Sequence, residues 1–149
     1  MHVLVPMDYS DLATKALRTA CSLHPAADIT VLHVIDFRTS DLGPGGWGET
    51  PTTWDDWLAD ARDHADELLA DAQAVAAEYD VDIATDTAVG EDAQTIVGYT
   101  EDNDVDLIIM GSHGRSLPAR ILLGDVSETV VRRAPVPVMV VRGQKHLDA

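Results

Sequence analysis

The stretch of sequence that decides the fold is residues 107–141, LIIMGSHGRSLPARILLGDVSETVVRRAPVPVMVV. It opens on an apolar run, Leu107 to Met110, which predicts a central strand that ends at Gly111. After a loop with a further glycine, Asp125 to Arg133 predicts a short helix and Val136 to Val141 predicts a last strand. A strand, a loop, a helix and a strand in this order indicate part of a parallel sheet.

The rest of the chain repeats this alternation of apolar runs and amphipathic segments. We predict further strands at 2–6, 29–35 and 82–89, and further helices that start after Ser10, at Thr53 and after Gly90. Five strands that alternate with four helices predict a single-domain α/β fold with an open parallel five-stranded sheet. In such sheets ligands bind beyond the carboxyl ends of the strands, so the residues after each strand are the candidates for a site.

A long connection separates the second predicted strand from the longest predicted helix. Residues 37–53 are rich in Gly, Pro and Thr, and we expect them to form either a lid or a disordered insertion. Trp54 and Trp57 follow at helical spacing and are interpreted as helix core or as an anchor for that lid. The single cysteine, Cys21, lies in an apolar helical context, which predicts a buried thiol.

Charge is the unusual feature of the composition. The 149 residues include 26 Asp and Glu against 10 Lys and Arg, so the formal net charge is −16. Such a surface disfavours non-specific nucleic-acid binding, which depends on basic side chains, and it repels anionic membranes. We interpret the chain as a cytoplasmic protein of a halophile, with an acidic mesophilic protein as the alternative. The opening residues, MHVLVPMD, show no charged leader, which also favours the cytoplasm.

A carboxylate follows the first predicted strand. Asp8 comes two residues after Pro6 and two residues before the predicted helix cap, Ser10. Its carboxylate either accepts hydrogen bonds from a ribose or an adenine edge, or holds backbone N–H groups of the turn before Ser10. Both interpretations stay open on the sequence.

Three glycines punctuate the stretch after the fourth predicted strand. Gly111 and Gly114 allow the backbone to approach a ligand closely, and Gly124 opens a helix whose free N–H groups favour an anion. These properties suit a phosphate cradle. The alternative is that the first two glycines only form a tight exit from the strand.

Polar side chains lie between these glycines. Arg115 and Arg120 either donate bidentate hydrogen bonds to phosphate oxygens or pair with surface carboxylates. His113 is either a donor to a phosphate or a ribose, or an ordinary surface residue. Ser112 is adjacent to His113, but two neighbours at a turn do not make a catalytic triad. The chain has no H-x-x-H, C-x-x-C or G-x-S-x-G pattern, so we predict no catalytic nucleophile and no metal site.

The segment 110–142, together with VPMDYS at 5–10 and LHVID at 32–36, resembles the universal stress protein family. The resemblance covers nearly the whole chain, and its most specific element is the spacing Gly111-x2-Gly114-x9-Gly124. It implies a Rossmann-like adenine-nucleotide-binding fold with the strand order 3-2-1-4-5 and a homodimer in which the last strands of two subunits pair. We expect one such domain over 1–142, with a polar C-terminal tail at 143–149.

The resemblance also implies a nucleotide site. In the nucleotide-binding branch of the family the glycine pattern ends in Gly followed by Ser or Thr and holds ATP, usually with a divalent cation. Applied to this sequence, the resemblance implies that Asp8 and Val34 flank the adenosine. It also implies that Pro6 shapes the adenosine pocket and that Gly111 lies against the ribose. The residues implied to line the phosphates or to start the cradle helix are Ser112, His113, Gly114, Arg115, Gly124, Val126 and Ser127.

The chain departs from that pattern at Asp125, where the nucleotide-binding branch has the hydroxyl residue. The run from Asp125 to Glu128 predicts a capping box, and the resemblance implies that the same carboxylate lies near the phosphates. We expect a cytoplasmic homodimer that binds adenine nucleotide, ATP with or without Mg²⁺, in stress response or signalling, with at most slow ATP hydrolysis. The alternative is a homodimeric interaction module of the same family that binds no nucleotide.

Overall fold

A computed structural model of the chain describes residues 1–36, 53–112 and 123–143. Strands and helices alternate along it, as the sequence predicts. They are β1 (His2–Pro6), α1 (Asp11–Leu23), β2 (Asp28–Ile35), α2 (Trp54–Ala77), β3 (Ile83–Val89), α3 (Asp92–Asp102), β4 (Leu107–Gly111), α4 (Asp125–Arg133) and β5 (Val138–Val141). The predicted α/β class is confirmed. The predicted lid or insertion at 37–53 lies, except for Thr53, outside the described residues.

The five strands form one sheet in the order β3-β2-β1-β4-β5, and each neighbouring pair is parallel. The implied order 3-2-1-4-5 is therefore confirmed. Pro6 at the end of β1 pairs with Leu32 of β2, and Gly111 at the end of β4 pairs with Val141 of β5. Because all strands run the same way, the residues that follow them gather along one edge of the sheet.

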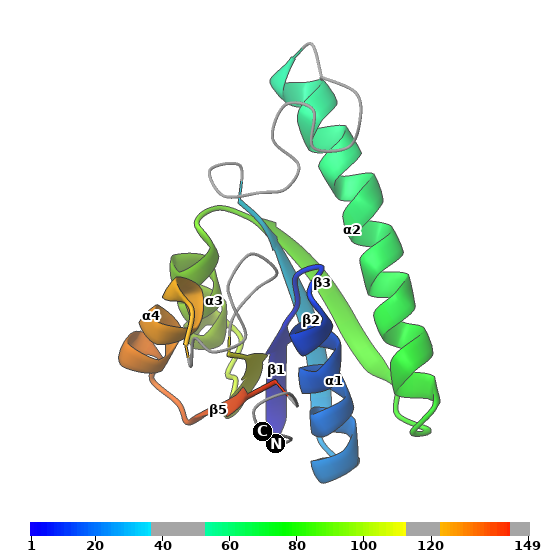
Figure 1. Cartoon of the computed structure of the whole chain (residues 1–149), viewed down its shortest axis with the longest axis vertical. Helices are drawn as coiled ribbons and strands as arrows, with labels where there is room; N and C mark the ends of the chain where they lie inside the picture. Colours follow the sequence, from blue (N-terminus) through cyan, green and yellow to red (C-terminus); the bar gives the residue numbers. More distant parts are fainter. Residues whose placement is uncertain (37–52, 113–122, 144–149) are drawn as a thin grey trace.

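Helices cover both faces of the sheet, with α1 and α2 on one side and α3 and α4 on the other (Figure 1). Alternate strand residues explain this arrangement, since successive side chains point to opposite faces. On the first face Val3, Val5 and Val31 pack in one core with side chains of α1 and α2. On the second face Leu4, Leu32 and Val34 pack with α3 and α4. The near-continuous apolar runs of the central strands follow from this double cover.

Two helix caps were predicted correctly. The Ser10 hydroxyl accepts a hydrogen bond from the backbone N–H of Ala13 at 3.2 Å, and α1 begins at the next residue. The Thr53 hydroxyl accepts from the N–H of Asp56 at 3.0 Å, and α2 begins at Trp54. Each cap satisfies one of the N–H groups that a helix leaves free in its first turn.

Buried Asp36 caps α3 from a distance, and the sequence analysis missed it. The residue before α3, Glu91, makes no side-chain cap hydrogen bond. Instead the Asp36 carboxylate, just beyond the end of β2, accepts from the N–H of Asp92 at 3.0 Å. The distance in sequence hides this cap from a local pattern. It fastens the N-terminus of α3 to the carboxyl edge of the sheet.

The predicted start of the last strand was wrong, and the two tryptophans of α2 differ in burial. β5 begins at Val138 rather than Val136, because Pro135 and Pro137 have no N–H group to donate to a strand ladder. The core interpretation holds for Trp57, which is 8% exposed, but not for Trp54, which is 50% exposed. The two indoles stack with their centroids 5.0 Å apart, so Trp57 is the buried partner of a surface ring.

Cys21 is buried in the core formed by α1, α2 and the sheet, as predicted. Burial raises the pKa of its thiol, and this effect is larger than the opposing influence of Arg18. The thiol is therefore protonated at neutral pH and unreactive as a nucleophile. None of the helices in the described ranges is long and apolar enough to cross a membrane.

Candidate functional site

Gly111 lies at the end of β4, where the chain passes close to the start of α1. A Cβ atom placed on Gly111 would lie 2.9 Å from the Cβ of Leu12 and 3.2 Å from its carbonyl carbon. Contacts this short leave no room for a side chain, so packing against α1 already requires glycine here. The alternative of a tight strand exit therefore has direct structural support for Gly111.

The N-terminus of α4 is fixed beside the end of β4 by two hydrogen bonds. The N–H of Gly124 donates to the carbonyl oxygen of Ser112 at 2.7 Å, and the hydroxyl of buried Ser127 donates to the carbonyl oxygen of Gly111 at 2.9 Å. Ser112 is also buried, and its N–H donates to the carbonyl oxygen of Val141 at 2.8 Å. A strand end and a helix N-terminus are thus held together, with the positive end of the helix dipole at the carboxyl edge of the sheet.

The predicted capping box at Asp125 is wrong. Gly124 is the cap residue, Asp125 is already the first residue of α4, and no side chain caps the helix. The reason is that the N–H of Glu128 donates to the carbonyl oxygen of Gly124 at 2.9 Å, so the first intrahelical hydrogen bond starts at Gly124 and this N–H is not left for the Asp125 side chain. The Asp125 carboxylate is therefore exposed and not used as a cap. Val126, one residue on, is half-buried and packs against the core under α3 and α4.

Asp8 holds the turn that leads into α1. Its Oδ1 accepts a hydrogen bond from the backbone N–H of Ser10 at 2.8 Å and another from the Ser10 hydroxyl. Of the two interpretations left open by the sequence, the turn-holding one is therefore observed. The Asp8 side chain is exposed. A role toward a ligand is compatible with this geometry.

Two other predicted residues lie on the face of the sheet that α3 and α4 cover. Val34 of β2 is buried there with Met110 of β4. Pro6 is buried at the end of β1, and strand alternation places it on the same face as Leu4. Pro6 is the last residue of β1 and Val34 is the last but one of β2, so both lie at the carboxyl ends of their strands.

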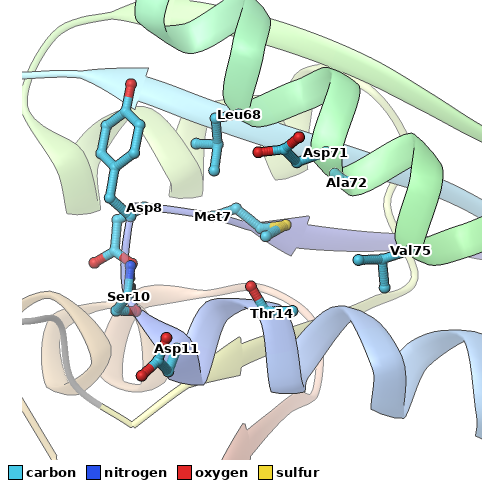
Figure 2. Close-up of a pocket in the computed structure, with 10 residues that line it drawn as sticks. Met7, Asp8, Ser10, Asp11, Thr14, Leu68, Asp71, Ala72 and Val75 are labelled. Atoms are coloured by element: carbon cyan, nitrogen blue, oxygen red, sulfur yellow. Dashed lines mark hydrogen bonds between the residues drawn. The ribbon is translucent and has the colours of Figure 1, made fainter.

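A cavity of about 240 Å³ opens on the opposite face, between α1 and α2. Figure 2 shows Asp11 and Thr14 of α1 on one side, Leu68 and Asp71 of α2 on the other, and Met7 between them. Among the predicted site residues that the structure describes, Asp8 alone lines this cavity. It was not predicted, because its walls come from two helices far apart in the sequence.

His33 was also missed, since it lies inside the apolar run of β2. It is buried, its Nδ1–H donates to the carbonyl oxygen of Met7 at 2.8 Å, and the ring of Tyr9 meets it edge-on with centroids 5.2 Å apart. Burial lowers the pKa of His33, an effect larger than the opposing ones of the Met7 hydrogen bond and Asp8. Burial also raises the pKa of Tyr9 to about 12, and Glu67 adds to that shift. Both rings are therefore neutral beneath the β1–α1 turn at neutral pH.

We expect the free energy of unfolding to fall as the pH drops below about 6.5, the ordinary pKa of histidine. The unfolded chain binds a proton at His33 more readily than the folded protein, so acid favours unfolding. Urea unfolding at several pH values between about 7.5 and 5.5 measures this loss. The variant His33→Asn keeps a donor for Met7, and we expect it to lose less stability over the same range.

His24→Asn is the matched control. It removes the histidine at the end of α1, which is not the one bonded to Met7. We expect it to retain the wild-type pH dependence. If His33→Asn and wild type lose equal stability between these pH values, buried His33 is not the group responsible.

Several predicted residues cannot be placed. His113, Gly114, Arg115 and Arg120 lie outside the described residues. Within the described ranges, no group of three or more His, Cys, Asp or Glu side chains is arranged to hold a metal ion. The residues that the structure does bring together at the carboxyl edge are Pro6, Asp8, Val34, Gly111, Ser112, Gly124, Asp125, Val126 and Ser127.

An open parallel sheet with helices on both faces, and with a helix N-terminus beside a strand end, defines a Rossmann-like α/β protein. The model of the universal stress protein family matches residues 1–142. Universal stress protein MJ0531 of Methanocaldococcus jannaschii is 30% identical over 145 residues, covering 96% of this chain and 82% of the relative. Universal stress protein YxiE of Bacillus subtilis is 33% identical over 146 residues, covering 94% and 97%. The chain belongs to the universal stress protein family.

Solved structures show the same fold. Universal stress protein UspA from Lactobacillus plantarum has a TM-score of 0.78 at 29% identity, covering 95% of this chain and 97% of its own. A universal stress protein in complex with cAMP has a TM-score of 0.65 at 23% identity, covering 95% and 97%. The Archaeoglobus fulgidus protein in complex with dAMP has a TM-score of 0.67 at 22% identity, covering 95% and 98%.

Proposed function

We propose that this protein binds an adenine nucleotide at the carboxyl edge of its sheet and acts in the cytoplasm in stress response or signalling. Its family supports the proposal, since two structures of the same fold hold dAMP and cAMP. Open parallel sheets bind ligands at this edge. ATP is the ligand that the glycine spacing favours in the family.

The single observation that carries the proposal is the position of the α4 N-terminus. Hydrogen bonds from Gly124 to Ser112 and from Ser127 to Gly111 hold it at the end of β4. The free N–H groups of a first helical turn, together with the helix dipole, favour a phosphate. The proposed site residues are Pro6, Asp8, Val34, Gly111, Ser112, His113, Gly114, Arg115, Gly124, Asp125, Val126 and Ser127.

The described residues fit the parts of a nucleotide unequally. Pro6 and Val34 supply apolar surface next to the edge, and Asp8 supplies an exposed acceptor for a ribose or an adenine edge. The backbone N–H groups of α4 suit a phosphate, but the exposed Asp125 carboxylate beside them repels one. A Mg²⁺ ion would supply positive charge toward a phosphate, and the exposed Asp125 carboxylate has the oxygen ligands that would hold it.

Calorimetric titration with AMP and ATP tests the proposal. The variant Asp8→Asn keeps an oxygen acceptor for Ser10, so the turn survives, but it removes the charge that a ribose hydroxyl or an adenine amino group would meet. We expect this variant to bind about tenfold more weakly, because hydrogen bonds to charged groups contribute roughly 1.5–3 kcal/mol. Asp11→Asn, three residues away in the first turn of α1, is the control and should bind as wild type does. Equal affinities for all three proteins would remove Asp8 from the site.

We also propose a homodimer through β5. This strand lies at one edge of the sheet, next to β4. The carbonyl oxygens of Pro137 and Val141 accept hydrogen bonds from Ile108 of β4 and from Ser112, the residue just after β4. Because backbone groups alternate along a strand, those of Val138 and Val140 point away from β4 and are oriented to pair with a second copy. The same edge supports the alternative function, an interaction module that dimerises without nucleotide.

A further inference from the structure

The strand β3 forms the edge of the sheet opposite to β5, and within the described ranges it pairs with β2 alone. All 7 of its residues are in register with β2, so the other side of the strand is a long edge. Such edges attract further strands unless charges, prolines or bulges protect them. The strand, IATDTAV, contains one charged residue, Asp86, and no proline. Asp86 is therefore the candidate for protecting this edge.

The backbone groups of β3 point alternately toward β2 and away from it. The N–H of Gly90, just after the strand, donates to the carbonyl oxygen of Ile35 in β2 at 3.0 Å. Because these directions alternate along a strand, the N–H and carbonyl groups of Asp86 also point toward β2. Those of Thr85 and Thr87 point away from β2, where a further strand would find them.

The side chain of Asp86 already occupies one of these outward donors. Its Oδ1 accepts a hydrogen bond from the N–H of Thr87 at 2.8 Å, and its Oδ2 accepts from the hydroxyl of Tyr99 in α3 at 2.9 Å. The Tyr99 ring packs against the core under α3 and α4, so the carboxylate is held from a fixed position. Burial raises the pKa of Tyr99 to about 12, and the hydrogen bond and charge of Asp86 add to that shift. The hydroxyl is therefore a donor at neutral pH.

A second copy of the chain would meet the same carboxylate. Two identical edges pair isologously when their strands run antiparallel. Asp86 is the central residue of β3, so full overlap places the Asp86 side chains of the two copies opposite each other. Because the backbone groups of Asp86 point toward β2, the two residues form the closer, non-hydrogen-bonded kind of pair, with Cα atoms about 4.5 Å apart. Like charges directly opposite each other destabilise a strand pair.

We propose that Asp86, positioned by Tyr99, prevents the β3 edge from pairing with a second copy of this chain. The carboxylate acts in two ways, since it occupies the N–H that Thr85 of the second copy would need and it repels its own counterpart. The opposite edge strand, β5, has no charged residue in Val138–Val141. The inference is independent of nucleotide binding.

The variant Asp86→Val removes both the hydrogen-bond acceptor and the charge. Asp86 is exposed, and valine suits a strand, so the subunit should keep its fold, which circular dichroism can check. Asp82→Val is the matched control, because it makes the same substitution at an exposed aspartate just before β3. Tyr99→Phe removes only the hydroxyl that holds Oδ2 and leaves the ring in the core.

Sedimentation equilibrium in 2 M KCl measures the pairing, since the Debye length is below about 3 Å there and the general repulsion between acidic surfaces is screened. At tens of micromolar we expect the average mass of Asp86→Val to be at least about twice that of wild type in the same buffer. Asp82→Val should keep the wild-type mass. The inference is overturned if Asp86→Val keeps the wild-type mass, or if Asp82→Val gains as much.

Hydrogen exchange at the Thr87 amide measures the side-chain hydrogen bond directly. NMR is run at a concentration at which all the proteins have the same mass, and the rates are corrected for the effect of the neighbouring side chain. An edge amide without a partner exchanges readily, so we expect exchange at least about tenfold faster in Asp86→Val than in wild type. Tyr99→Phe should give a smaller increase and Asp82→Val none. Equal corrected rates in wild type and Asp86→Val overturn the role of the hydrogen bond, and an unchanged rate in Tyr99→Phe overturns the role of Tyr99.

Discussion

Replacement of Val140 by proline is expected to convert a dimer of this chain into monomers. Val140 lies in the edge strand β5, and its N–H points away from β4, as the bonds of Ser112 and Ile108 to Val141 and Pro137 require. Proline removes that outward donor, and edge strands accept proline at such positions. Sedimentation equilibrium should report two subunits of 16.0 kDa for wild type and one for Val140→Pro.

The fold of a single subunit should survive this change. Val141 and Arg142 anchor the end of β5 independently, since their carbonyl oxygens accept from Ser112 at 2.8 Å and from the Lys15 side chain at 2.7 Å. Val140→Thr keeps the N–H and is the control, which should remain a dimer. A wild-type protein that sediments as a monomer at tens of micromolar contradicts the proposed interface, as does a dimeric Val140→Pro protein.

Stability is expected to rise strongly with salt. A formal charge of −16 on 149 residues means that surface carboxylates repel one another unless cations screen them. We expect the melting midpoint to increase by about 5–10 °C between about 0.1 and 2 M KCl, or roughly 2–3 kcal/mol for a domain of this size. A midpoint that stays constant or falls in thermal melts contradicts the interpretation of the chain as a halophile's protein.

Two aspartates lie just after the C-terminal ends of helices, where a negative charge is unfavourable. Asp80 after α2 and Asp104 after α3 have positive φ angles of 57° and 52°, in the left-handed region that favours glycine or asparagine. Both also place a negative charge at the negative end of a helix dipole. The double variant Asp80→Asn and Asp104→Asn should raise the free energy of unfolding by about 0.6–2 kcal/mol at low salt, and by much less at 2 M KCl.

A charge-matched control separates the dipole effect from general repulsion. Asp11→Asn with Asp55→Asn removes the same charge, but from the first turns of α1 and α2, where carboxylates are favourable. We expect this pair of changes to lower stability at low salt, or to raise it less. If both double variants gain equal stability in urea unfolding, helix ends have no part in the effect.

The sequence predicts most of the fold because its signals are local. Apolar runs such as Leu107 to Met110 identify buried strands, and hydroxyls such as Ser10 and Thr53 identify helix starts. The errors arise where a contact between residues far apart in the sequence determines a helix cap. The bond between Gly124 and Ser112 ties the cap residue of α4 to the end of β4, and buried Asp36 caps α3 across the fold.

The candidate site is less predictable because packing and binding require the same residue types. Gly111 is at a strand end as predicted. However, its close approach to Leu12 already requires glycine for packing, and a spacing pattern cannot reveal this. Asp8 similarly holds Ser10 in the turn. The chemistry of His33 and the cavity between α1 and α2 escaped prediction, since both depend on elements that only the fold brings together.

The central claim is that the site at the end of β4 holds an adenine nucleotide. Its most direct test is to purify the protein without added nucleotide, denature it, and identify what is released by mass spectrometry. The account predicts that adenine nucleotide is released, and that Asp8→Asn releases less. The claim is contradicted if no adenine nucleotide is released and calorimetry then finds no binding of AMP, cAMP or ATP.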